Sequence, residues 1–248
     1  MKGIENGTKT FLQEFNMSGK YLSDIIRERM KSDGKRFFAC DNISEYLSDA
    51  HRDSLISELT IKFNDVLKSL LIDIDNDPNS MGTGRRLAKM YVNEIMSGRY
   101  YPAPDCTSFP NEGDEKYTGM LVVRSELKSM CSHHHQPVTG VAYIGIIPGK
   151  KVIGLSKYTR IAQWHARRGT LQEELCTHIA SSIMKATESG DVAVYIQATH
   201  GCVENRGLCA HSSLTQTTVL KGAFNDADVK KEFFDNIQLQ QTFASNKS

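Results

Sequence analysis

The spacing of the hydrophobic residues first changes from a helical to a strand pattern at about Lys116, and this change most constrains the possible folds. Before it, apolar side chains recur three or four residues apart over 43–74, which predicts a helix. The Asp-Pro-Asn segment at 77–79 ends that helix, because proline cannot continue it. A second helix is predicted over 84–97, followed by a polar loop over 100–116.

After Lys116 the pattern is typical of strands. Runs of β-branched and apolar residues predict strands at 120–123, 138–147, 152–153, 191–199 and 215–224. Helical periodicity returns over 156–188 and in a closing helix over 226–239. This order predicts an α+β fold, in which an N-terminal helical portion precedes strands with helices on one face.

The composition is that of a soluble globular protein. The 248 residues are 40% hydrophobic and 24% charged. Thirty Lys and Arg oppose 29 Asp and Glu, and the net charge of +1 gives no case for a protein that coats nucleic acid or a membrane surface. No apolar run approaches the roughly 20 residues that span a bilayer, and the N-terminus lacks the apolar stretch of a signal peptide. We therefore expect a cytoplasmic protein whose six cysteines are reduced.

Cysteine and histidine gather in two short segments that suit a metal. The first is Cys-Ser-His-His-His at 131–135, and the second is His-Gly-Cys at 200–202, directly after a predicted strand. Thiolate and imidazole are the ligands that zinc prefers. Cys131, His134 and Cys202 together would leave a fourth position open, as catalytic zinc sites do, with His133 and His200 beside them to move protons. An exposed polar loop that binds metal adventitiously is the alternative.

Basic residues near these segments suggest an anion site. Lys157 and Arg160 lie three apart at a predicted helix start, and Arg206 follows Cys202 by four residues. Helix N-terminal N–H groups with Lys and Arg can hold phosphates, although ordinary surface charge explains the same residues. Glu173 at another helix start could simply complement the helix dipole.

Several of these segments occur together in the order and spacing of one known family. The matching segments are 86–95, 131–134, 154–160, 171–175, 198–202, 206–207 and 215–218. In this order they resemble GTP cyclohydrolase I over about 55–234. We accordingly divide the chain into a polar, loosely packed N-terminal extension (1–42), a GTP cyclohydrolase I-like domain (43–240) and a flexible tail (241–248).

The resemblance implies a tunnelling fold (T-fold), in which an antiparallel sheet is backed by helices and subunits assemble into a torus. Family members are typically homodecamers of two pentamers, with active sites at subunit interfaces. The implied reaction converts GTP and water to 7,8-dihydroneopterin triphosphate and formate. The product could enter folate, biopterin-type or 7-deazaguanine biosynthesis, and the sequence does not choose among these routes.

The resemblance also implies a role for each matched residue. Cys131, His134 and Cys202 would hold Zn²⁺, which activates water for attack at C8 of guanine. His200 would assist at the imidazole ring, and His133 near the ribose. The implied substrate-binding residues are Gln172 and Glu173 for the guanine edge and Ser156, Lys157, Arg160 and Arg206 for the triphosphate, with Arg86 reaching in from a neighbouring subunit.

The chain departs from the family pattern at a few positions. Ser132 stands where an acidic residue is usual, His135 where a hydrophobic residue is common, Gly169-Thr170 where Pro-Gln is frequent, and Glu174 where Arg is common. These departures leave two alternatives open: the substrate is a related purine nucleotide such as dGTP, or the protein is a non-catalytic metal-binding scaffold. A 7-deazaguanine nitrile reductase would not need the zinc ligands, and a zinc nucleoside deaminase would need His-x-Glu and Pro-Cys-x-x-Cys, which are absent.

Overall fold

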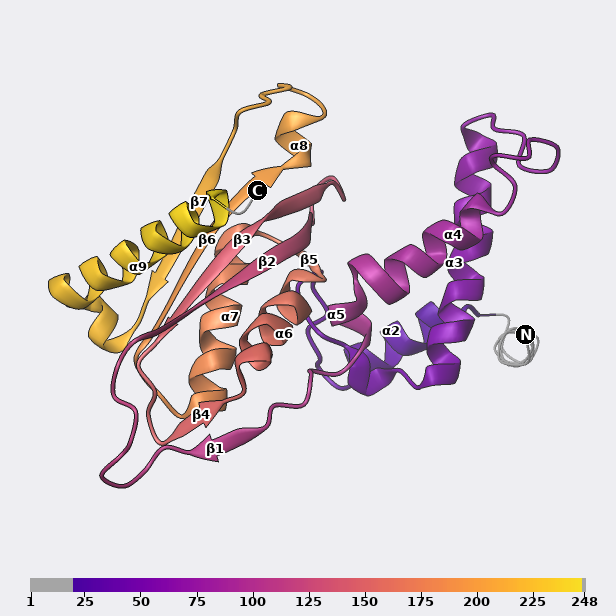
Figure 1. Cartoon of the computed structure of the whole chain (residues 1–248). Coiled ribbons are helices and arrows are strands. Elements are labelled where there is room, and N and C mark those ends of the chain that lie inside the picture. Colours follow the sequence, from indigo (N-terminus) through magenta and orange to yellow (C-terminus); the bar gives the residue numbers. More distant parts are fainter. Residues whose placement is uncertain (1–19, 247–248) are drawn as a thin grey trace. The chain divides into compact units, whose positions relative to one another are not determined.

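The computed structural model describes residues 20–246, which form two compact units joined at Pro102–Ala103 (Figure 1). Residues 1–19 and 247–248, parts of the predicted extension and tail, lie outside the described residues. No helix within 20–246 combines the length and the apolar character needed to cross a bilayer. All six cysteines are free thiols.

The N-terminal unit is helical. Its elements are α2 (Leu22–Ser32), the 3-10 turn η1 (Ser44–Tyr46), α3 (Asp49–Ser69), α4 (Thr83–Met90), the π-helical turn η2 (Tyr91–Ile95) and α5 (Ser97–Tyr100). Helix α2 lies in the segment that we expected to be a loosely packed extension. It instead buries Leu22, Ile26 and Met30, spaced four residues apart on one face, against Ile43 and Leu47. The expectation of loose packing is therefore wrong for 22–32.

Buried Glu58 ties α2 to α3. Its side chain is 1% exposed, and its carboxylate accepts hydrogen bonds from the N–H and Oγ of Ser23, at 3.0 and 2.5 Å. Lys62, one turn further along α3, supplies the balancing charge at 2.6 Å. A buried carboxylate needs such partners, because leaving it unpaired costs several kcal/mol.

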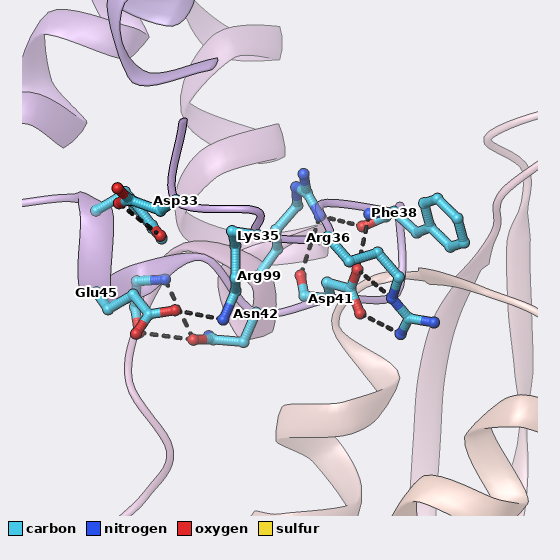
Figure 2. Close-up of polar contacts among 10 residues, drawn as sticks. Asp33, Lys35, Arg36, Phe38, Asp41, Asn42, Glu45 and Arg99 are labelled. Carbon is cyan, nitrogen blue, oxygen red and sulfur yellow. Dashed lines mark hydrogen bonds and ion pairs between the residues drawn. The ribbon is translucent and has the colours of Figure 1, made fainter. Parts of the chain in front are cut away.

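The segment before η1 is attached to α5 by hydrogen bonds from side chains to main-chain carbonyls (Figure 2). The Arg99 guanidinium donates to the carbonyl oxygens of Phe37, Phe38 and Asp41. The Asn42 amide donates to the carbonyls of Gly98 and Tyr101, at 2.9 and 2.7 Å. Two side chains thus satisfy five carbonyls that no helix or strand pairs.

The predicted helix over 84–97 is interrupted in the structure. It begins one residue earlier as α4, widens into η2 and re-forms as α5. Gly84 lies so close to α3 that a Cβ there would be 2.2 Å from Oδ1 of Asn64 and 2.9 Å from the Thr60 carbonyl. This glycine allows α4 to pack on α3 at backbone distance.

The C-terminal unit contains a five-stranded sheet in the order β5-β2-β3-β6-β7. The strands are β2 (Leu121–Cys131), β3 (Pro137–Ile146), β5 (Gly169–Thr170), β6 (Val192–His200) and β7 (Thr215–Leu220). All neighbouring pairs are antiparallel except the short β2–β5 pair. A separate ladder joins β1 (Ser108–Pro110) to β4 (Lys151–Ile153), so the predicted loop over 100–116 contains a strand.

Helices cover both faces of this sheet (Figure 1). Helices α6 (Leu155–Ala166) and α7 (Gln172–Thr187) pack on one face, and α9 (Ala227–Ser245) packs on the other with the turn η3 (Gly222–Asn225). Alternate residues of β6 point to opposite faces: Val194 and Ile196 pack under α6 and α7, whereas Ala193 and Tyr195 pack under α9. Our expectation of helices on one face only is corrected by α9.

The α+β class with an antiparallel sheet backed by helices is confirmed, whereas several boundaries differ. Strand β2 is much longer than the predicted 120–123, and β5 divides the helical region at 156–188 into α6 and α7. The strand predicted over 215–224 ends at Leu220. Helix α9 continues to Ser245, into the segment that we expected to be a flexible tail.

Candidate metal and catalytic site

The three predicted metal ligands come together at one end of the sheet. Cys131 is the last residue of β2, His134 lies in the turn that follows, and Cys202 lies in the short helix α8 (Gly201–Glu204) directly after β6. Their ligand atoms, two Sγ and one imidazole nitrogen, all lie within 4.8 Å of one another. Sequence spacing could not show that segments about seventy residues apart meet, and the structure places them together.

Strand register explains the meeting. Strand β3 lies between β2 and β6, with Pro137 opposite Met130 and Val138 opposite His200. The residues that follow β2 and β6 therefore emerge side by side. The turn between β2 and β3 is closed by a hydrogen bond from His135 N–H to the Cys131 carbonyl, at 2.9 Å, and His135 adopts a left-handed conformation with φ 51°.

The donor set fits zinc. Zn–S and Zn–N bonds of about 2.3 and 2.0 Å place tetrahedral ligands about 3.5 to 3.8 Å apart, and ligand atoms that all lie within 4.8 Å of one another can adopt that spacing with small side-chain movements. Burial raises the pKa of the Cys202 thiol, the adjacent Cys131 raises it further, and the Arg206 charge partly offsets both. A bound cation would stabilise such a thiol as the thiolate. If these three residues held a zinc ion, a fourth position would be open to water or substrate.

His200 lies beside the ligand group at the end of β6, where it is held by Gln172. The His200 Nε2 and the Gln172 Oε1 are 2.8 Å apart. Burial lowers the pKa of His200, and the charges of Glu173 and Glu204 act in the opposite direction. Gln172 begins helix α7 and is 5% exposed.

His133 is exposed in the turn, with its ring centroid 6.3 Å from that of His134. Exposure leaves it accessible to a bound ligand, and no hydrogen bond orients it within the described chain. The structure therefore brings His133 to the site without fixing its role.

The predicted phosphate-binding residues are less organised. Ser156, Lys157 and Arg160 lie in the first turns of α6, and Lys157 Nζ donates to the Asp105 carbonyl at 2.7 Å. Ser156, Arg160 and Arg206 are exposed. Arg206 is close enough to Cys202 to influence its thiol, whereas no hydrogen bond or ion pair joins Ser156, Lys157 or Arg160 to the ligand group within residues 103–246.

Arg86 belongs to the N-terminal unit. Its guanidinium donates to the carbonyls of Asn79 and Met81, both at 3.0 Å, and to Oγ1 of Thr83 at 2.7 Å. It is thus used in closing the loop before α4. The predicted contribution of Arg86 to a neighbouring subunit's site stays a prediction.

Sequence reasoning missed the groups that surround Gln172. Its Nε2 donates to the carbonyls of Ile196 and Thr215 and to Oγ1 of Thr217, at 3.3, 3.2 and 3.1 Å. The segment 215–218 was part of the family resemblance but had no assigned role. The position of this segment in the family pattern was the signal that it has a role. Only the packing of α7 on β6 and β7 shows that the segment contacts Gln172.

The fold and the site together define a class: an α+β protein with a Cys-His-Cys group that could hold a metal ion, and with two flanking histidines, at one end of an antiparallel sheet. Comparison with known proteins gives the family. The sequence model of GTP cyclohydrolase I matches residues 63–238. The chain belongs to the GTP cyclohydrolase I family, as the sequence motifs indicated.

Individual relatives agree. A GTP cyclohydrolase 1 of Flavobacterium johnsoniae is 37% identical over 226 residues, covering 90% of this chain and 97% of that protein. A GTP cyclohydrolase 1 of Aeromonas salmonicida is 40% identical over 176 residues, covering 70% of this chain and 79% of that protein. Among solved structures, an apo archaeosine synthase QueF-Like covers 42% of this chain and 93% of its own at 14% identity, with a TM-score of 0.35. The family assignment rests on sequence similarity alone.

Proposed function

We propose that this chain is a zinc-dependent GTP cyclohydrolase I, which converts GTP and water to 7,8-dihydroneopterin triphosphate and formate. The observation that carries the proposal is the convergence of Cys131, His134 and Cys202 beside His200, in a chain whose relatives are named GTP cyclohydrolase 1. When bound by these three residues, zinc supplies Lewis acidity that makes water a nucleophile near neutral pH.

The protein's own side chains transfer protons and bind the guanine base. His200 exchanges a proton with the imidazole ring of guanine, and exposed His133 acts near the ribose. Glu173 is exposed at the start of α7, and its carboxylate can accept hydrogen bonds from guanine N1–H and the 2-amino group. Its negative charge already acts on His200, which supports its place beside the same site.

The triphosphate is bound by basic and hydroxyl side chains. Ser156, Lys157 and Arg160 contribute from the first turns of α6, where main-chain N–H groups add to the positive potential. Arg206 contributes from the loop after α8, close to the metal ligands.

We further propose the homodecameric assembly of the family, with sites at subunit interfaces and Arg86 donated by a neighbour. Membership of the GTP cyclohydrolase I family supports this assembly. A cytoplasmic location is consistent with GTP as substrate. Analytical ultracentrifugation tests the assembly, and a stable, fully active monomer would contradict it.

Turnover of GTP by the zinc-loaded protein tests the function. Formate release and the fluorescent pterin formed on oxidation are measured together, with and without a strong chelator. We expect both products, and we expect the chelator to abolish both. Formate without pterin would show an enzyme that stops after ring opening, and no product from GTP or dGTP would contradict the proposed function.

A further inference from the structure

The Gln172 side chain has a role that guanine reading does not explain. Its two amide hydrogens are shared among three acceptors, the carbonyls of Ile196 and Thr215 and Oγ1 of Thr217. Its carbonyl oxygen faces Nε2 of His200 at 2.8 Å. The NH₂ group is therefore already occupied by strands β6 and β7, and donating to a nucleotide would require breaking those bonds.

These contacts fix which way the amide points. Main-chain carbonyls of Ile196 and Thr215 only accept hydrogen bonds, so the NH₂ end of Gln172 must face them. Turning the amide over would set its oxygen against two carbonyl oxygens and its nitrogen against His200. The strands therefore determine that Oε1, an acceptor, is the atom presented to the imidazole.

An acceptor facing Nε2 determines the proton on His200. Nε2 must carry hydrogen to make this bond, whether the imidazole is neutral or protonated. In the neutral ring the lone pair is then on Nδ1, and no group within residues 20–246 makes a hydrogen bond to that nitrogen. The surroundings strengthen the restraint, because Gln172 and His200 line a small cavity whose other walls are mostly apolar, formed by Leu127, Val138, Leu175, Ile196 and Ala198 with Ser129 and Thr170.

We propose that Gln172 is a positioning residue, which holds His200 in the Nε2–H tautomer so that Nδ1 is the nitrogen that exchanges protons with substrate. The proposal rests on the proposed function for its consequence in catalysis, but the tautomer itself follows from the contacts. The segment of Gln172 also connects β2 and β6, the strands that carry or precede the proposed metal ligands. Gln172 bonds to β6, and Thr170, two residues before it, pairs with Cys131 of β2 through the β5–β2 ladder.

A purely structural role for Gln172 predicts a different outcome, and Cys176 supplies the matched control. Cys176 lies one turn further along α7, is fully buried, and donates from Sγ to the Val194 carbonyl at 3.2 Å. It thus attaches the same helix to the same strand, and its hydrogen bonds do not involve His200. Cys176→Ala removes a helix–strand bond, whereas Gln172→Met removes the bonds of Gln172 at nearly constant volume.

Solid-state ¹⁵N NMR of zinc-loaded protein labelled at histidine reads the tautomer at any assembly size. His200 signals are identified by their loss in His200→Asn, at a pH above the pKa of free histidine. We expect a protonated Nε2 and an unprotonated Nδ1 in the wild type and in Cys176→Ala. In Gln172→Met we expect both tautomers, because the about tenfold preference from one hydrogen bond is gone.

Steady-state kinetics with GTP gives the second readout. We expect Gln172→Met to lower kcat about tenfold to a hundredfold with KM changed less than about threefold, and Cys176→Ala to change both less than about threefold. The proposal is overturned if wild-type His200 carries its proton on Nδ1, if Gln172→Met keeps the wild-type tautomer, or if KM rises while kcat is unchanged. A protein without GTP turnover would contradict the proposed function, and the NMR result would still decide the tautomer.

Discussion

The metal-ligand group and the proposed phosphate-binding residues lie in the same unit but differ in how firmly the fold holds them. Cys131 is the last residue of β2, and Cys202 lies two residues after the end of β6. His200 is hydrogen-bonded to the Gln172 amide, which is itself hydrogen-bonded to β6 and β7. Ser156, Arg160 and Arg206 are exposed, and their side chains make no hydrogen bond or ion pair within residues 20–246. The proposed catalytic groups are thus built on a fixed frame, whereas we expect the proposed anion-binding side chains to become ordered when the anion binds.

The largest effect is expected from removing a metal ligand. Cys202→Ser weakens the site, because a serine hydroxyl is a poor zinc ligand, and we expect GTP turnover to fall at least about a thousandfold with loss of bound metal. Metal content and formate release measured on the same sample check this. Cys209→Ser is the matched control, since Cys209 is exposed and outside the ligand group. Retention of both metal and turnover in Cys202→Ser would show that the site is misassigned.

A smaller effect is expected from the anion-binding residues. Arg160→Ala removes one charge-assisted contact to the triphosphate, and we expect KM for GTP to rise about tenfold to a hundredfold with little change in metal content. Arg167→Ala, at the other end of α6, is the matched control and should leave KM within about twofold. Loss of metal in Arg160→Ala would contradict the separation of the metal-ligand group from the proposed phosphate-binding residues.

Acid should destabilise the helix layer that carries the α6 residues. His165 on α6 is 7% exposed, its Nε2 is 2.7 Å from Oγ of Ser182 on α7, and burial, with smaller contributions from Arg168 and His178, lowers its pKa to about 3. The unfolded chain binds this proton at about pH 6.5, so stability that is complete above that pH is lost as the pH falls towards 3.

The expected loss through His165 is about 2 kcal/mol between pH 7 and pH 5. Chemical denaturation of wild type and His165→Gln at the two pH values measures it as a difference. The glutamine variant cannot titrate and should lose less stability than wild type over this interval. Equal losses would show that His165 is not the group responsible.

The smallest effect is expected at Ser132, between Cys131 and exposed His133. Ser132→Glu introduces the acidic residue that is usual in the family. A solvated carboxylate near the site contributes under about 1 kcal/mol, so kcat should change no more than about fivefold. Turnover at low and high salt checks this, since the effect should diminish with ionic strength. A change beyond a hundredfold would mean that this position sets the rate.

The grouping of the three candidate metal ligands could be predicted from sequence because cysteine and histidine occur in short segments at strand ends, where few alternative positions exist. The contacts of Gln172 could not, because they depend on how α7 lies over β6 and β7, which no local pattern records. Strand β5 could not be predicted either, because a strand of two residues is too short to show a periodicity. Helix α2 was missed because three buried residues among polar neighbours gave a weak pattern.

Zinc K-edge X-ray absorption on the purified protein tests the central claim most directly. The account predicts a zinc ion with two sulfur ligands together with nitrogen or oxygen donors, and loss of sulfur coordination in a Cys131→Ser, Cys202→Ser double variant. A spectrum with only nitrogen and oxygen ligands, or one unchanged in the double variant, would contradict the assignment of Cys131, His134 and Cys202 as the metal site.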